Sequence, residues 1–267
     1  MTLYRGFDAD TLEREYSPSS MIGGDYMPFA SRYVSESETA RRMPGVRQDL
    51  SYGPGPAHVL DYFPAEKSGA PLHVFIHGGY WQELSQKESA AMAPGIIAAG
   101  SAFATLNYTL APHATLTEIV DEVELALLWL STKSDELGFD RQRITLSGHS
   151  AGAHLAAMML SRSHELTIER VVLISGVFDL TPIPDTSVND VLRLGRNDVP
   201  ALSPMMLQPV LKPAVDIVVA EQDTAEFRRQ SRDYHHHLVD AGIPTMFREI
   251  PGLNHFDIIL EPSVFST

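Results

Sequence analysis

The sequence predicts an α/β fold with a mostly parallel central sheet of about eight strands and helices on both faces. Strand-like and helix-like segments alternate from residue 72 to residue 250, and such alternation places parallel strands between helical crossovers. The chain has 267 residues, 44% hydrophobic and 20% charged, as in ordinary globular proteins. Because no repeat, low-complexity tract or linker divides it, we expect a single domain over residues 1–267.

Charge and cysteine content narrow the classes of function. The net charge of −14 disfavours nucleic acid and anionic membranes as partners. The expected partner is a small-molecule substrate. The chain has no cysteine, so disulfides, thiolate catalysis and cysteine-bound zinc are excluded. The first ten residues lack the pattern of a signal peptide, and no apolar run is long enough to span a bilayer. We therefore expect a cytoplasmic protein, for which a homodimer is one option.

Residues 1–45, the N-terminal segment, have no clean periodicity but carry many large apolar side chains. A solvated tail would not be so aromatic, so we expect irregular helices packed on the main body. They either cap the candidate site or contribute packing alone. A short helix is predicted over residues 35–42, stopped by Pro44 and Gly45.

The predicted sheet consists of short apolar runs separated by helical patterns. The first two runs flank a Gly-Pro-Gly-Pro turn and predict a hairpin at the edge of the sheet. Strands are predicted over residues 46–52, 58–63, 72–76, 102–107, 143–147, 170–175, 214–220 and 245–250. Helices are predicted over residues 86–99, 117–137, 153–160 and 225–241. Thr117 is the expected cap of the second helix.

Residues 176–213 interrupt the alternation. The segment is rich in Pro, Asp and Leu, with a short helix predicted near residues 188–194 and closed by Gly195. It is inserted between two sheet strands, so we expect a lid-like insertion or a pocket wall.

The stretch Gly148-His149-Ser150-Ala151-Gly152 joins a predicted strand to a predicted helix. Gly-x-Ser-x-Gly in this context is typical of a nucleophile elbow, a sharp turn that exposes the serine hydroxyl. Because the helix begins at this turn, the amide of Ala151 is expected to face an oxyanion formed beside Ser150. The alternative is a glycine-rich turn with an incidental serine.

A serine nucleophile needs a base, and functional groups of a parallel sheet gather beyond the carboxyl ends of its strands. His255 follows the last predicted strand and is the expected base. His77, in a glycine-containing loop, and His149, inside the elbow, are weaker candidates. His235, His236 and His237 occupy consecutive helical positions that do not share a face, so no metal site is expected.

Three carboxylates compete for the role of the acid that orients the base. Asp216 lies inside the strand 214–220 and should not reach its end, whereas Glu221 and Asp223 lie in the turn that follows. Asp223 is preferred because it is further past the strand, next to the following helix.

A second glycine motif, His77-Gly78-Gly79-Tyr80-Trp81, directly follows the buried strand 72–76. Its glycines let the backbone approach a reacting carbonyl. We expect the oxyanion hole in this loop of Gly78, Gly79 and Tyr80, completed by Ala151. Losing one such donor typically costs about 10²–10³ in rate. The alternative is a Gly-Gly turn that only ends a strand.

Together these motifs resemble the α/β-hydrolase superfamily, in which the triad follows the order Ser, Asp, His. More narrowly, the chain resembles the kynurenine formamidase (arylformamidase) group and its bacterial esterase relatives. Residues 77–81 match that group's His-Gly-Gly-x-Trp motif, and residues 148–152 match its nucleophile motif. The resemblance covers the chain from about residue 52. It implies Ser150, Asp223 and His255 as the triad, with an oxyanion hole from the amides of Gly79 and Tyr80.

The expected function is that of a cofactor-free serine hydrolase that cleaves a small amide or ester through an acyl-enzyme. The resemblance implies an aryl formamide such as N-formylkynurenine as substrate, with release of formate. Trp81 is expected to wall an aryl-binding pocket, with a core position as the alternative. A small-molecule carboxylesterase is the second candidate. A catalytically inactive hydrolase fold that binds a ligand is the candidate of another class.

Overall fold

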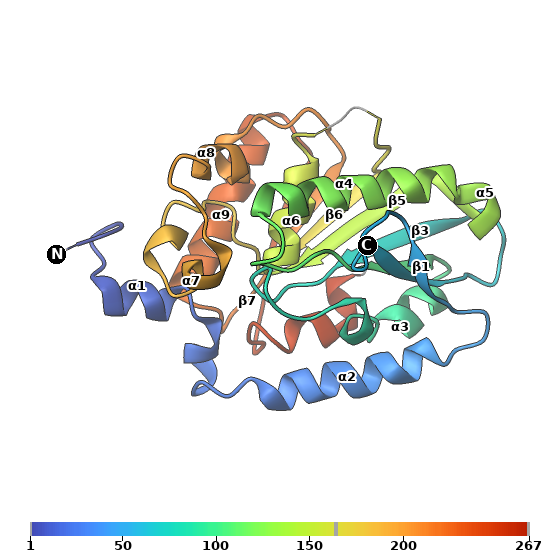
Figure 1. The fold of residues 1–267 in the computed structure, drawn as a ribbon, viewed down its shortest axis with the longest axis horizontal. Helices are drawn as coiled ribbons and strands as arrows, with labels where there is room; N and C mark the ends of the chain where they lie inside the picture. The colour runs from blue at the N-terminus through green and yellow to red at the C-terminus, as the bar shows by residue number, and fades with distance from the viewer. Residues whose placement is uncertain (1, 163–164, 266–267) are drawn as a thin grey trace.

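An eight-stranded sheet forms the centre of the computed structural model, which describes residues 2–162 and 165–265 (Figure 1). Its strands follow the order β1-β2-β4-β3-β5-β6-β7-β8. They are β1 (Arg47–Ser51), β2 (Val59–Phe63), β3 (Ala70–Ile76), β4 (Ala102–Leu106), β5 (Phe139–His149), β6 (Arg170–Ile174), β7 (Ala214–Ala220) and β8 (Thr245–Ile250).

The sheet is parallel except at one edge. The pairs β1–β2 and β2–β4 are antiparallel, and all the pairs from β4–β3 through to β7–β8 are parallel. The predicted fold class and edge hairpin are therefore confirmed. Because the parallel strands run the same way, the loops after β3, β5, β7 and β8 emerge at one edge of the sheet.

Helices cover both faces of the sheet (Figure 1). Successive strand residues point to opposite faces, and β3 accordingly sends Leu72, Val74 and Ile76 into one apolar core and Phe75 into another. The first core includes side chains of α4 (Leu116–Thr132), α6 (Ala151–Met159) and α9 (Ala225–Asp240). The second includes side chains of α2 (Met27–Arg41), α3 (Ala93–Ala98) and the 3-10 turns η5 (Ile258–Leu260) and η6 (Pro262–Val264).

Shorter elements complete the chain. The N-terminal segment contains α1 (Ala9–Glu15) and η1 (Pro18–Ile22) besides α2. The 176–213 insertion contains η3 (Ile183–Asp185), α7 (Asn189–Leu192), α8 (Val199–Leu202) and η4 (Pro204–Met206). The remaining two are η2 (Gln86–Glu88) and α5 (Ser134–Leu137). Across the described residues, no helix combines the length and the apolar character needed to cross a membrane.

Several predicted helix boundaries are wrong. The helix expected over residues 86–99 is only η2 and α3, because Pro94 lacks the amide that a continuous helix needs and is tolerated only in the first turn. The helix expected over residues 35–42 begins at Met27. The short helix of the insertion is closed by Arg193, at φ 55°, rather than by Gly195.

The cap of α4 is Thr115 rather than Thr117. The Thr115 hydroxyl accepts the amide of Glu118, and the Glu118 carboxylate accepts the amide of Thr115 at 2.7 Å. This reciprocal capping box satisfies two amides that helical hydrogen bonds leave free. The helix then breaks at Lys133, and α5 ends at Gly138 in the left-handed conformation.

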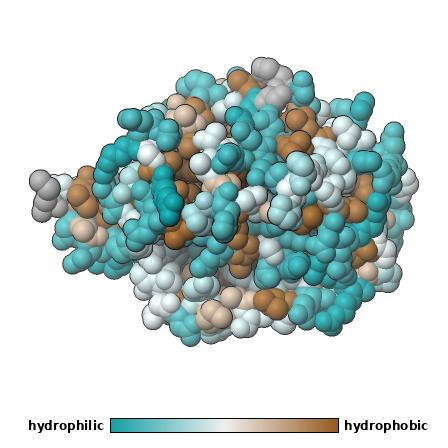
Figure 2. Space-filling view, viewed as in Figure 1, coloured by the Kyte–Doolittle hydropathy of each residue, from teal (hydrophilic) through white to brown (hydrophobic). Residues whose placement is uncertain are grey.

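The N-terminal segment crosses the bottom of the molecule as α2 and reaches the insertion as α1 (Figure 1). It carries several exposed large apolar side chains, among them Met21, Met27 and Val34. Hydrophilic side chains cover most of the face drawn in Figure 2, with apolar ones scattered among them.

Candidate active site

Ser150 stands at the turn between β5 and α6 in a strained backbone conformation. Its φ of 55° and ψ of −118° lie in a region that non-glycine residues rarely occupy, and such strain persists only where the surroundings fix it. Its amide donates to the carbonyl of Ile174 at 2.9 Å. A Cβ at Gly148 would overlap the Gly152 carbonyl, and one at Gly152 would overlap the Ile76 carbonyl. The turn therefore needs both glycines, as an elbow requires.

His255 and Asp223 form a buried pair beside this turn. The Nδ1 atom of His255 lies 2.8 Å from Oδ1 of Asp223. The two side chains are 5% and 0% exposed, so water screens the interaction little. The second oxygen of Asp223, Oδ2, is buried and has no hydrogen-bond partner in the described part of the chain. Among the described side chains, the imidazole of His255 is thus the hydrogen-bond partner of this buried carboxylate.

The other two candidate acids lie elsewhere. Asp216 pairs with Arg170 inside the sheet. Glu221 accepts the amide of Gly252 at 2.7 Å and thereby holds the loop that carries His255. The same loop is tightened by Asn254, whose side-chain oxygen accepts the amide of Phe256 at 2.8 Å.

Each of the two weaker histidine candidates has a ring nitrogen that contacts a backbone carbonyl. The Nε2 atom of His149 lies 2.8 Å from the carbonyl oxygen of His255, and burial, aided by the neighbouring His255, holds the pKa of His149 well below its ordinary value. A neutral His149 donates this bond and so fixes the His255 backbone. Burial also lowers the pKa of His77 to about 4. Its ring stacks on Tyr108 and its Nδ1 contacts the Gly78 carbonyl.

The His-Gly-Gly loop lies directly against the elbow. A Cβ at Gly78 would come within 3.1 Å of the Cβ of Ser150. The φ angles of Gly79, Tyr80 and Trp81 are 92°, 47° and 60°. Within the described residues, the amides of Gly78, Gly79, Tyr80 and Ala151 donate to no protein acceptor. These are free donors of the kind that an oxyanion hole supplies.

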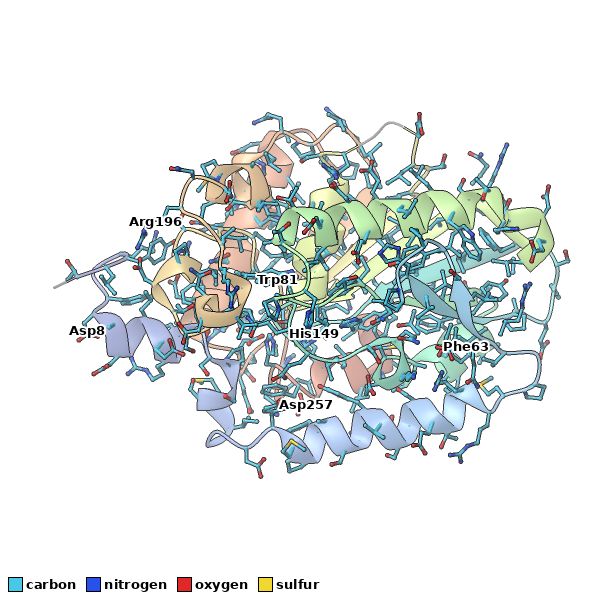
Figure 3. The ribbon with its side chains drawn as sticks, in the orientation of Figure 1. Asp8, Phe63, Trp81, His149, Arg196 and Asp257 are labelled. Atoms are coloured by element: carbon cyan, nitrogen blue, oxygen red, sulfur yellow. The ribbon has the colours of Figure 1, made fainter. Side chains whose placement is uncertain are left out.

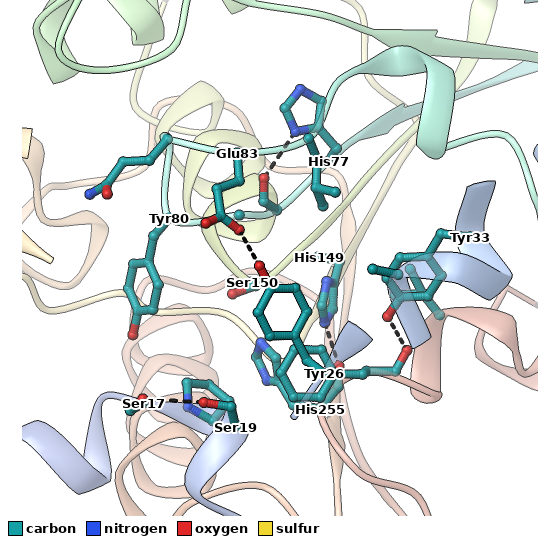
Figure 4. A pocket seen from close by; sticks show the side chains of 18 of the residues that line it. Ser17, Ser19, Tyr26, Tyr33, His77, Tyr80, Glu83, His149, Ser150 and His255 are labelled. Atoms are coloured by element: carbon teal, nitrogen blue, oxygen red, sulfur yellow. Dashed lines mark hydrogen bonds between the residues drawn. The ribbon is translucent and has the colours of Figure 1, made fainter. Parts of the chain in front are cut away.

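Ser150 and His255 line one cavity of about 270 Å³, drawn in Figure 4. His77, Gly78, Gly79 and Tyr80 also line it, as do Ser187 and Val188 of the 176–213 insertion. The insertion therefore contributes a wall of the pocket.

The N-terminal segment contributes a further wall. Glu13, Tyr16, Tyr26 and Tyr33 line the cavity, and the Tyr26 hydroxyl donates to Glu83 at 2.9 Å across it (Figure 4). These residues follow no periodic pattern in the sequence. Their aromatic content was the sole hint.

Trp81 takes a core position rather than a place in the pocket wall. It is fully buried and belongs to the first apolar core, and its ring contacts that of His154 at 5.0 Å. Figure 3 shows it at the centre of the molecule, with Asp8 and Arg196 at the periphery. Among the described residues, no group of three or more His, Asp or Glu side chains is arranged to hold a metal ion.

Known proteins share this architecture and sequence. The BD-FAE family model matches residues 60–193. Kynurenine formamidase of Salmo salar is 33% identical over 97% of this chain and 93% of its own. A candidate thioesterase from Silicibacter is 28% identical with a TM-score of 0.83 and covers 96% of both chains.

More distant structures share the fold. The hyperthermophilic esterase of Pyrobaculum calidifontis is 20% identical with a TM-score of 0.74, over 98% of this chain and 93% of its own. The order of the strands in the sheet, the loops at the strand ends and the sequence similarity all indicate the same fold family. The chain belongs to the kynurenine formamidase family of α/β-hydrolases.

Proposed function

We propose that this hydrolase uses Ser150 as its nucleophile, His255 as its base and Asp223 as the acid that orients the base. The observation that carries the proposal is the buried 2.8 Å contact of Asp223 with His255, which lines the same cavity as Ser150. When the Nδ1–H of a neutral imidazole is held by the carboxylate, Nε2 is the atom that accepts the serine proton.

The proposed reaction has two halves. Ser150 Oγ attacks a carbonyl carbon while His255 takes the hydroxyl proton, which it then gives to the leaving amine or alcohol. The negative oxygen of the tetrahedral intermediate is held by free amides of the Gly78–Tyr80 loop and Ala151. Water, activated by the same imidazole, then releases the acyl group from Ser150.

We propose an aryl formamide bearing an ammonium group, such as N-formylkynurenine, as the substrate. The relation to a kynurenine formamidase over nearly the whole chain supports this choice. The cavity walls include Tyr26, Tyr33 and Phe256, which suit an aryl group, and the rings of Tyr26 and Phe256 stack at 5.7 Å. Its charged lining consists of Glu13, Glu83 and Glu88, with no Lys or Arg among the described lining residues. Carboxylates favour a cationic group on the substrate.

The test compares purified wild-type protein with Ser150→Ala on two substrates, N-formylkynurenine and p-nitrophenyl acetate. We expect kcat/KM to be higher for the formamide, and we expect Ser150→Ala to fold normally and lose about 10⁴-fold or more of the activity. Ser131→Ala, which changes a serine on α4 outside the cavity, is the matched control and should keep full activity.

Each result has a distinct meaning. Undiminished turnover by Ser150→Ala would remove Ser150 from the mechanism. Ester cleavage far faster than formamide cleavage would leave the serine mechanism intact and replace the formamide by a small ester as the substrate.

A further inference from the structure

The oxyanion loop has a backbone that needs external support. Gly79, Tyr80 and Trp81 all have left-handed φ angles, and only the first of them is a glycine, for which this conformation carries no steric cost. The core holds one end of the loop in place. Trp81 is fully buried, and its carbonyl accepts a hydrogen bond from the amide of Ala111 at 2.8 Å. Tyr80, whose amide is a candidate oxyanion donor, is only partly buried and needs a different anchor.

That anchor comes from the N-terminal segment. The Tyr80 hydroxyl donates to the carbonyl oxygen of Tyr16 at 2.6 Å. Figure 4 shows the Tyr80 ring extending from its loop toward the segment that carries Ser17 and Ser19. Tyr16 belongs to the turn between α1 and η1, so residues 64 positions apart in sequence are joined here.

Tyr16 is itself fixed to the last long helix. Its side chain is 2% exposed. Its hydroxyl donates to Glu226 at 2.9 Å and accepts from Gln230 at 2.8 Å, both on α9. Such a fully paired buried network restricts each of its members to one position.

The neighbouring residue Glu15 is tied to the turn that holds the candidate acid. The Thr224 hydroxyl donates to the Glu15 carbonyl at 2.7 Å, and Thr224 directly follows Asp223. Residues 15 and 16 therefore connect the loop of Tyr80 with the turn of Asp223.

We propose that Tyr80 and Tyr16 are positioning residues, in which the Tyr80 hydroxyl, held by Tyr16, places the Tyr80 amide for the oxyanion. The inference rests on the proposed serine mechanism. The N-terminal segment then has a role in transition-state stabilisation. If the Tyr80 amide shifts by a fraction of an ångström, its hydrogen bond to the oxyanion weakens, and this bond is strongest in the transition state.

The test is Tyr80→Phe, which removes the hydroxyl and keeps the backbone amide. We expect kcat to fall about 10-fold, less than the loss of a whole oxyanion donor, while KM changes less than twofold. Affinity for phenylboronic acid, which forms a tetrahedral adduct with an active-site serine, should fall in parallel with kcat. The midpoint of the pH–rate profile should stay where it is, because His255 and Asp223 are untouched.

Tyr62→Phe is the matched control. Like Tyr80, Tyr62 donates to a backbone carbonyl, that of Leu137 at 2.8 Å, but it is buried and lies outside the cavity. This variant loses an equivalent bond and should keep wild-type kcat and boronate affinity. Thermal unfolding of both variants separates a loss of positioning from a loss of fold.

A double-variant cycle tests the link between the two tyrosines. Tyr16→Phe should also lower kcat, and the double variant should be no slower than Tyr80→Phe within twofold, since both changes act through one contact. An unchanged kcat in Tyr80→Phe, a rise in KM alone, or multiplicative losses in the double variant would overturn the inference while the enzyme remains active. Failure of wild-type protein to hydrolyse either substrate and to react with a fluorophosphonate at Ser150 would overturn both proposals.

Discussion

The elbow glycine at position 152 shows how one missing side chain determines a site. Gly152 lies so close to the end of β3 that an added Cβ would overlap the carbonyl oxygen of Ile76. Since that oxygen belongs to the backbone of a central strand, it cannot move aside. The closeness places the His-Gly-Gly loop, which starts at residue 77, beside Ser150.

We predict that Gly152→Ala is strongly destabilising. Forcing an atom into this packed contact should cost about 3 kcal/mol, the upper part of the usual range for overpacking. Urea unfolding measures the change. Gly95→Ala is the control, because Gly95 is exposed on α3 with open space around its Cβ position. It should stabilise by about 0.5–1 kcal/mol. Equal effects of the two substitutions would contradict the packing account.

The candidate site residues that the sequence predicts directly follow strands. Ser150, Asp223 and His255 each come just after a strand of a parallel sheet, and the topology carries them to one edge. Tyr16 and Glu83 could not be found this way, because only tertiary packing brings them to the cavity. The motif predicts a tryptophan after the loop but not the side to which its ring turns. The sequence therefore leaves the pocket wall and the core as alternatives for Trp81, which the structure places in the core.

Helix ends in this chain depend on local chemistry that periodicity does not report. The apolar pattern predicts α4, but the cap expected from the sequence, Thr117, lies two residues after the observed cap. Thr115 is the residue that has the extended backbone of a cap, with φ −73° and ψ 159°. The helix expected over residues 86–99 is likewise interrupted for a local reason. Pro94 has no backbone amide to donate, so a continuous helix does not form there despite the apolar pattern.

At this scale we predict that Thr115→Ala destabilises the protein by about 1 kcal/mol, the typical value for a lost cap. The substitution removes the hydroxyl that accepts the Glu118 amide and donates to the Glu118 carboxylate. Thr117→Ala is the control: Thr117 is exposed inside α4, so this change should be neutral or slightly stabilising. Differential scanning calorimetry measures the stability of both variants. A larger loss of stability in Thr117→Ala than in Thr115→Ala would contradict the assignment of Thr115 as the cap.

For the whole molecule, buried histidines make stability depend on pH. Burial lowers the pKa of His73 to about 3 and that of His154 to about 4, and His77 and His149 are shifted in the same direction. These side chains stay neutral in the folded protein at pH 5–6.5, whereas they bind protons in the unfolded chain. Protons therefore favour unfolding as the pH falls below about 6.5.

We predict a free energy of unfolding that is flat near pH 7.5 and falls between pH 6.5 and 5, by about 1.4 kcal/mol per pH unit for each such histidine. Urea titrations across this range measure it. His154→Gln retains a donor for the Leu202 carbonyl, which contacts His154 in the wild-type protein. This variant should lower the pH dependence of the free energy of unfolding by the contribution of one histidine. A slope unaffected by that change would contradict the assignment.

The fold as a whole was more predictable than the site. Eight strands and their crossovers follow from alternating apolar runs, because burial on both faces leaves a pattern that survives in sequence. The packing of the N-terminal segment leaves no such pattern, since its contacts with α9 and the insertion join residues 174 to 210 positions apart.

Those contacts have a consequence for folding. One wall of the cavity comes from Glu13, Tyr16, Tyr26 and Tyr33, whereas another comes from the insertion, and Figure 1 shows the blue N-terminal segment beside the orange later segments. Local packing of neighbouring stretches of chain therefore cannot complete the cavity. It closes only when segments that are widely separated in the sequence have met.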